Sequence, residues 1–203
     1  MINLLPCFFM SPYIRLFNGS DHNINLYKSG FLTFANLKPY CFTPYIKVCP
    51  GTQILEIAQN NIRQNIELKF APEDVYCLCA VKNNNSYRII PVNEPSCNKP
   101  EQYGYVRFIN ISSKFSQADI YANSECIISG INIGDISKYI AILPGIYRFS
   151  AKNANKGIKS KFPIQNLNIE PGKYHSLYIT DHVNSSIAIT PTTDAANHKG
   201  FIL

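Results

Sequence analysis

The chain has 203 residues, of which 46% are hydrophobic and only 16% are charged, and its formal net charge is +6. This length allows one or two domains, each with its own hydrophobic core. The charge is spread evenly, since residues 1–100 have nine Lys or Arg against six Asp or Glu and residues 101–203 have ten against seven. That distribution argues against nucleic acid as a partner, because nucleic-acid binding needs a basic patch or stripe.

Residues 1–11 form an apolar arm that begins MINLLPCFFM. The stretch has no basic start, its apolar run is interrupted by Pro6, and no small-residue cleavage site follows, so it does not match a secretory signal peptide. No segment of the chain has the roughly 20 apolar residues of a membrane-spanning helix. We therefore expect a protein that is made in the cytoplasm without a signal peptide and that has no membrane partner.

The next elements occur twice, which indicates a duplicated domain. Five segments recur in the same order, with offsets of 92, 94, 94, 98 and 100 residues: YIRLFNGS and YVRFINIS, NLYKSG and DIYANS, FTPYIKVCPG and ISKYIAILPG, PEDVYCL and EPGKYHSL, RIIPVNE and AITPTTD. The expected domains are residues 12–93 and 102–191. A connector lies between them at 94–101, made stiff by Pro95 and Pro100 together with the preceding Pro91, and a short tail follows at 192–203.

Both units consist of short segments rich in β-branched and aromatic residues, separated by Gly, Pro, Asn and Ser. In the second unit we expect strands at 105–111, 118–122, 138–143, 146–152, 166–170 and 174–180. Pro50-Gly51 and Pro144-Gly145 are suited to turns that need a positive φ at glycine. This spacing predicts an all-β protein made of two tandem antiparallel β-sandwiches with an extended N-terminal arm.

The second unit resembles a bacterial family known as domain of unknown function 4397. The resemblance rests on Val106-Arg107 in an opening strand, on Asp119 to Tyr121, on Tyr139 to Tyr147 and on Pro171 to Tyr174. The first unit departs from the pattern, since Asn25 replaces the acid, Gln53 replaces a tyrosine and residues 72–74 replace the second Pro-Gly. The resemblance implies immunoglobulin-like sandwiches on bacterial surface proteins, and it implies no catalytic residues.

No residue pattern points to catalysis, a metal or a cofactor. The histidines at 22, 175, 182 and 198 lack any metal-ligand spacing, and we interpret His175 as a surface residue at a strand start. Asp119 is replaced by Asn25 in the other copy, so a turn or hydrogen-bonding role is expected for it rather than acid–base chemistry. We therefore expect that the protein is not an enzyme.

The seven cysteines are odd in number, so at least one cannot pair within the chain. The offsets place Cys41, Cys49, Cys77 and Cys79 opposite Asp135, Leu143, His175 and Leu177, so the two cores share no disulfide. We expect Cys49 and Cys79 to act as small buried hydrophobic residues, because both replace leucine. Cys7 and Cys97 lie outside both expected cores and are the first candidates for disulfides between chains. The candidate set is Cys7, Cys97, Cys126 and Cys77.

Read as a strand, the arm is apolar on both faces. Ile2, Leu4 and Phe8 lie on one face, and Leu5 and Phe9 on the other. One alternative is that the arm is the first strand of its own domain. The other is that it adds to a sheet of a neighbouring copy, a head-to-tail contact that builds fibres when it does not close.

These features favour a structural subunit of a self-assembling bacterial surface fibre or coat, of the spore-coat or spore-appendage type. Its partners would be further copies of itself, with other coat proteins as additional candidates, and its location the cell or spore surface. The alternative is a surface module that binds glycan or another surface protein, for which the loop NNNSY at 83–87 offers amide side chains and a tyrosine.

Overall fold

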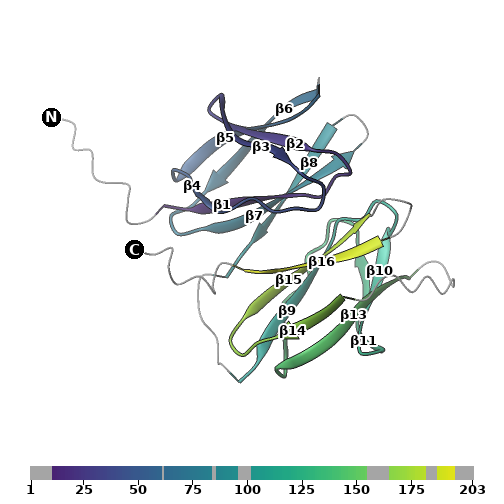
Figure 1. Cartoon of the computed structure of the whole chain (residues 1–203). Helices are drawn as coiled ribbons and strands as arrows, with labels where there is room; N and C mark the ends of the chain where they lie inside the picture. The colour runs from purple at the N-terminus through teal and green to yellow at the C-terminus, as the bar shows by residue number, and fades with distance from the viewer. Residues whose placement is uncertain are drawn as a thin grey trace. The chain divides into compact units, whose positions relative to one another are not determined.

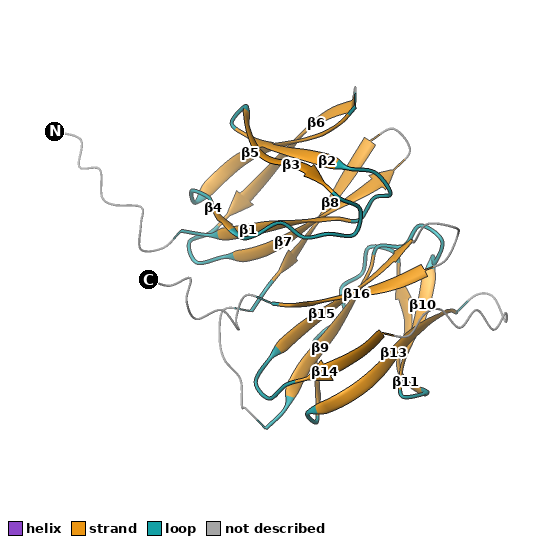
Figure 2. Ribbon diagram, in the orientation of Figure 1, coloured by secondary structure: helices purple, strands orange, loops and turns teal. Residues whose placement is uncertain are grey.

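The computed structural model describes residues 11–60, 62–83, 86–95, 102–154, 165–181 and 187–194, and it divides the chain into two compact units, 1–96 and 97–203 (Figure 1). The described residues form eight strands in each unit and no helix (Figure 2). In the first unit these are β1 (Tyr13–Asn18), β2 (Ile24–Lys28), β3 (Phe31–Leu37), β4 (Ile46–Lys47), β5 (Gly51–Gln59), β6 (Ile62–Phe70), β7 (Val75–Asn83) and β8 (Ser86–Asn93). In the second they are β9 (Gly104–Asn110), β10 (Gln117–Ala122), β11 (Glu125–Asn132), β12 (Ile140–Ile142), β13 (Gly145–Asn153), β14 (Gln165–Ile169), β15 (Tyr174–Asp181) and β16 (Ile187–Thr193).

Each unit is a sandwich of two four-stranded sheets, which confirms the predicted fold class. The strand orders are β4-β1-β7-β8 and β3-β2-β5-β6 in the first unit, and β12-β9-β15-β16 and β11-β10-β13-β14 in the second. The pairing is antiparallel except that β1 pairs in parallel with β7, and β9 with β15. Each sandwich has its own apolar core, represented by Leu16, Leu55 and Leu78 in one and by Phe108, Phe149 and Leu177 in the other.

The irregular alternation of the opening strands has a structural cause. All seven residues of β9 are buried, and five of the six in β1. Their core-facing side packs in the sandwich, and on the other side the rings of Tyr45 and Tyr139, just before β4 and β12, cover Arg15 and Arg107. A strand buried on both faces shows no period of two.

Asn25 and Asp119 have the same structural role, which agrees with the hydrogen-bonding role expected for Asp119. The N–H of Asn36 donates to Oδ1 of Asn25 at 2.7 Å, and the N–H of Gly130 donates to Oδ1 of Asp119 at 2.9 Å. Both contacts lie where β2–β3 and β10–β11 shift register. A side-chain oxygen thus satisfies a backbone donor that the irregular ladder leaves unpaired.

The sheets correct one predicted offset. Tyr13 pairs with Val75 in the first unit, and its equivalent Tyr105 pairs with Tyr174 in the second, so the offset here is 99 rather than 98. Cys77 is therefore equivalent to Ser176, and Cys79 to Tyr178. The offset of 98 matched two tyrosines by type, whereas Leu78 and Leu177 occupy the same position in the two cores.

Candidate functional site

Each sandwich contains a buried arginine on its first strand, Arg15 on β1 and Arg107 on β9, each 5% exposed. Parallel pairing places Arg15 beside Cys77 and Arg107 beside Ser176. Charged side chains are rarely buried unless they are paired. The partners in each unit come from the residue directly after the last strand and from the loop before the short strand.

In the first unit the partner is Glu94. The Nε of Arg15 donates to Oε1 of Glu94 at 3.0 Å, and its Nη2 lies 2.7 Å from the same oxygen. The hydroxyl of Tyr45 donates to Oε2 of Glu94 at 2.5 Å. The guanidinium also stacks over the rings of Phe42 and Tyr45, with 4.9 Å to each centroid. Charge, hydrogen bonds and aromatic faces together compensate the desolvation of the arginine.

In the second unit the acid is Asp194, whose side chain is one methylene shorter. The Nε of Arg107 donates to Oγ of Ser176 at 2.7 Å, and that hydroxyl donates to Oδ2 of Asp194 at 2.8 Å. The direct distance from Nη2 of Arg107 to Asp194 is longer, 3.4 Å. The hydroxyl of Tyr139 donates to the same carboxylate oxygen. The ring of Tyr139 lies under the guanidinium of Arg107, with 4.6 Å between the ring centroid and the guanidinium carbon. Serine thus bridges the gap that the shorter acid leaves.

The two tyrosines serve as donors in these centres. Burial, and then the adjacent Glu94 carboxylate, raise the pKa of Tyr45 far above its usual value, and burial and Asp194 do the same for Tyr139. Both phenols therefore keep their protons. The side chains of Glu94 and Asp194 are 0% exposed. Each carboxylate contacts the arginine of the first strand and the tyrosine of the loop, so each centre connects that strand and that loop to the end of the last strand.

His175 is a correction to the sequence interpretation, which placed it at the surface. It is 5% exposed on β15, and its Nε2 has no hydrogen-bond partner among the described residues. Burial lowers the pKa of His175, against the opposing field of Glu170. The strand start is buried here because both faces of β15 are covered.

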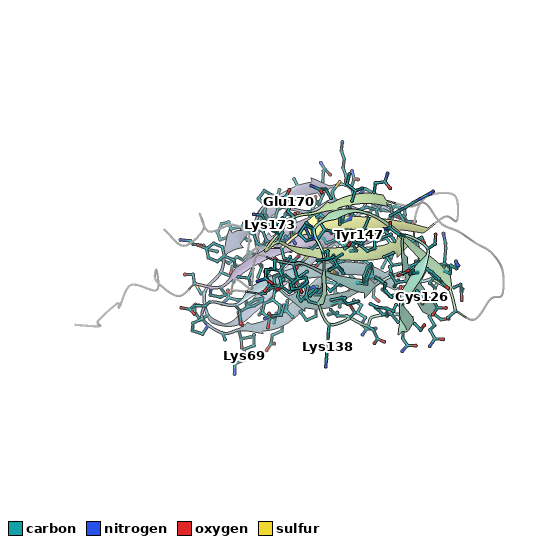
Figure 3. The ribbon with its side chains drawn as sticks, turned by 90° about the horizontal axis from the view of Figure 1, so that it is seen from below. Lys69, Cys126, Lys138, Tyr147, Glu170 and Lys173 are labelled. Carbon is teal, nitrogen blue, oxygen red and sulfur yellow. The ribbon has the colours of Figure 1, made fainter. Side chains whose placement is uncertain are left out.

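The described cysteines divide into two groups. Cys77 and Cys79 are fully buried on β7, whereas Cys41 and Cys49 are exposed, as is Cys126, which is labelled in Figure 3. A thiol with no exposure cannot reach another chain while the sandwich stays folded, so Cys77 is withdrawn as a candidate for an intersubunit disulfide. The expected burial of Cys49 is also wrong, and its equivalent Leu143 is itself 64% exposed.

Among the described candidates for disulfides between chains, Cys126 is the one whose thiol is exposed to solvent. It lies on β11, an edge strand, with Sγ 3.5 Å from the carbonyl oxygen of Ile128 and 3.4 Å from Oγ of Ser129. Cys41 and Cys49 are exposed as well and were missed, because only the loop geometry shows their accessibility. Cys7 and Cys97, and the arm residues Ile2, Leu4, Leu5, Phe8 and Phe9, lie outside the described residues.

Two general observations concern the described part of the chain alone. It contains no group of three or more His, Cys, Asp or Glu side chains placed to hold a metal ion. It also contains no helix with the length and hydropathy needed to span a membrane.

The family model of DUF4397, a domain of unknown function, matches the chain twice, at residues 12–117 and 104–200. A search of the curated proteins found no match. The two matched ranges contain the two sandwiches and the equivalent Arg15 and Arg107 centres. The chain therefore belongs to the DUF4397 family and carries two tandem copies of its domain.

Proposed function

We propose that this protein is a structural subunit of a self-assembling bacterial surface fibre or coat, of the spore-coat or spore-appendage type. Copies join head to tail through the N-terminal arm and are crosslinked by disulfides between chains. The observation that carries the proposal is the exposed thiol of Cys126 on an edge strand, in a chain that also has an uncharged apolar arm containing Cys7. An accessible thiol can form a disulfide with another chain once the assembly reaches an oxidising environment.

The two buried centres support a structural role rather than a catalytic one. The Glu94 and Asp194 side chains are 0% exposed and accept hydrogen bonds from the partly buried phenols of Tyr45 and Tyr139, so a substrate could reach the carboxylates only if the sandwich opened. We propose no cofactor and no enzymatic activity. The subunit would be made in the cytoplasm and act at the cell or spore surface, with other coat proteins as further partners.

The disulfide part of the proposal is tested on non-reducing gels of oxidised, assembled protein. We expect a covalent ladder that Cys126→Ser or Cys7→Ser shortens or removes. Cys77→Ser is the matched control, because this thiol is buried, and it should leave the ladder unchanged. If both surface-candidate variants show the wild-type ladder, the proposed crosslinks are wrong.

A second candidate function is a module that binds surface glycan. Tyr87, expected in the loop that would bind, is 2% exposed and donates to Gln59, so that loop offers no aromatic platform. A different observation favours binding: Tyr27 and its equivalent Tyr121 are half-buried and stack with Arg63 and Lys152 respectively. A glycan array probed with monomer tests this candidate, and loss of a signal in Tyr27→Ala and Tyr121→Ala variants would support it.

A further inference from the structure

The described sheets offer few edges to which residues 1–10 of the arm could add. β4, β12 and β14 have two, three and five residues, which is too short for the whole arm. β3 and β11 contain register shifts, and such irregularities interrupt pairing on an edge. β8 and β16 contain Pro91 and Pro191, which lack the N–H that an added strand needs.

β6 has none of these obstacles. It is nine residues long, contains neither proline nor glycine, and pairs with β5 from Gly51–Phe70 to Gln59–Ile62 without a register shift. It is the last strand of its sheet, and in the described part of the chain no strand pairs with its other side, although the side chain of Gln64 bonds to the Tyr87 backbone of β8 in the facing sheet (Figure 1). Exposed charged side chains, including Lys69, which extends away from the domain in Figure 3, project from it at alternate positions. Such charges discourage unspecific pairing of an edge.

The core-facing row of β6 is incompletely covered. Ile66 and Leu68 pack on the core but remain partly exposed, whereas Leu55 and Ile57 on the neighbouring β5 are 2% and 1% exposed. An additional strand beside β6 would bring apolar side chains next to this row. Strand addition of this kind combines backbone hydrogen bonds with burial of alternate side chains.

We propose that β6 is the acceptor edge for residues 1–10 of a neighbouring copy, an inference that rests on the proposed function. Residues 1–10 of the arm match the nine residues of β6 in length, carry no charged side chain, and include apolar residues that can extend the row of Ile66 and Leu68. The protein's own arm begins at the opposite margin of the sandwich. Val48, directly after β4, donates to the carbonyl oxygen of Pro12, whereas β6 borders β8, where Gln64 bonds to Tyr87.

Pro6 determines which residues of the arm can direct their N–H groups toward β6. In a β-ladder only alternate residues direct their N–H groups toward one neighbour, so a proline must occupy a position that faces away. Leu5 and Cys7 therefore pair with β6, and Leu4 does not. On the acceptor, two residues connect Gln59 and Ile62, which makes these the hydrogen-bonded pair that closes the hairpin. The alternation then directs the N–H of Glu67 away from β5, toward the incoming arm.

The first experiment compares proline variants by electron microscopy and sedimentation velocity under reducing conditions. Leu5→Pro should raise the concentration needed for polymerisation about tenfold or more, because it removes a pairing N–H, whereas Leu4→Pro should stay close to wild type. Glu67→Pro should act like Leu5→Pro. Its matched control is Asn166→Pro at the equivalent position of the shorter edge β14. Far-UV circular dichroism checks folding, and the arm variants remain informative if Glu67→Pro does not fold.

The second experiment mixes a chain that lacks residues 1–10 with the Glu67→Pro chain. At concentrations where wild type polymerises but Glu67→Pro does not, each chain alone should stay monomeric, and together they should form closed pairs, because one supplies the arm and the other the edge. If Leu5→Pro and Leu4→Pro polymerise equally, or Glu67→Pro polymerises like wild type, β6 is not the acceptor, although the proposed function stands as long as removal of the arm prevents polymerisation. If the chain without residues 1–10 polymerises like wild type, the proposed function itself fails.

Discussion

Arg15 and Glu94 lie 79 residues apart and meet in a buried ion pair, with Nη2 of the arginine 2.7 Å from Oε1 of the glutamate. The pair connects the first strand of the domain to the residue directly after its last strand. Arg107 and Asp194 make the equivalent connection in the second domain. A subunit that is held in a fibre at its two ends would benefit from such a connection, because it resists separation of the first strand from the last.

Loss of the Glu94 carboxylate should destabilise the first domain strongly. Glu94→Gln preserves size but leaves the buried charge of Arg15 without its counter-ion, which costs about 3–5 kcal/mol in comparable cases. Glu56→Gln is the matched control, because it disrupts the ion pair with Arg63, whose side chain is 62% exposed, and should cost about 1 kcal/mol or less. Urea unfolding followed by circular dichroism measures both. Equal losses of unfolding free energy in the two variants would show that the buried ion pair stabilises its domain no more than the exposed pair does.

The residues that distinguish the second buried centre, Asp194 and Ser176, can be introduced at the equivalent positions of the first, Glu94 and Cys77. Glu94→Asp alone should destabilise the first domain, since the shorter acid no longer reaches Arg15 well. Adding Cys77→Ser recreates the bridge that Ser176 forms in the second domain, and it should recover about 1 kcal/mol. A double-mutant cycle in urea gives the coupling. A coupling of zero would mean that Ser176 does not bridge the gap in the way described.

Replacing Ser124, in the hairpin turn between β10 and β11, by glycine should increase the stability of the second domain. Ser124 has a φ of 82° and its equivalent in the first domain is Gly30, with a φ of 79°. Positive φ strains an L-residue but not glycine, so Ser124→Gly should stabilise the second domain by about 0.5–1 kcal/mol. Thermal unfolding measures the change, and Gly30→Ser should shift stability in the opposite direction. A loss of stability in Ser124→Gly would refute the assignment of strain.

His175 should make the second domain sensitive to mild acid. Burial lowers the pKa of His175 in the folded state below its usual value of 6.5, so the unfolded chain binds the proton more readily. Its contribution to stability is therefore full above about pH 6.5 and is lost as the pH falls through the window between the unfolded and folded pKa. The slope of unfolding free energy against pH between about 5 and 6.5 should shrink in His175→Asn. An unchanged slope would assign the pH dependence to other groups.

The parts of the fold that follow from local chemistry were predictable. The repeat, the short strands, the Pro-Gly turns and the hydrogen-bonding role of Asp119 all depend on residues close together in the chain. The parts that depend on distant pairing were not. Arg15 and Glu94 have no local signal, and the register that makes Cys77 equivalent to Ser176 appears only when both sheets are aligned.

Burial was the hardest property to predict. Because both faces of β1 and β9 are covered, their side chains lack the alternation that separates core from surface. The same covering buries His175, which a strand start would normally expose. Cys49 shows the opposite error, since replacement of a leucine indicated a core position, but the equivalent Leu143 is exposed too.

Electron microscopy of purified full-length protein, compared with a chain that lacks residues 1–10, tests the central claim most directly. The proposal predicts regular fibres or sheets for the full chain, with greater resistance to dilution after oxidation than in reductant. It also predicts folded monomers for the shortened chain, which keeps both sandwiches. Dispersed monomers of the full chain at every concentration and redox condition, or the same assemblies from both chains, would contradict it.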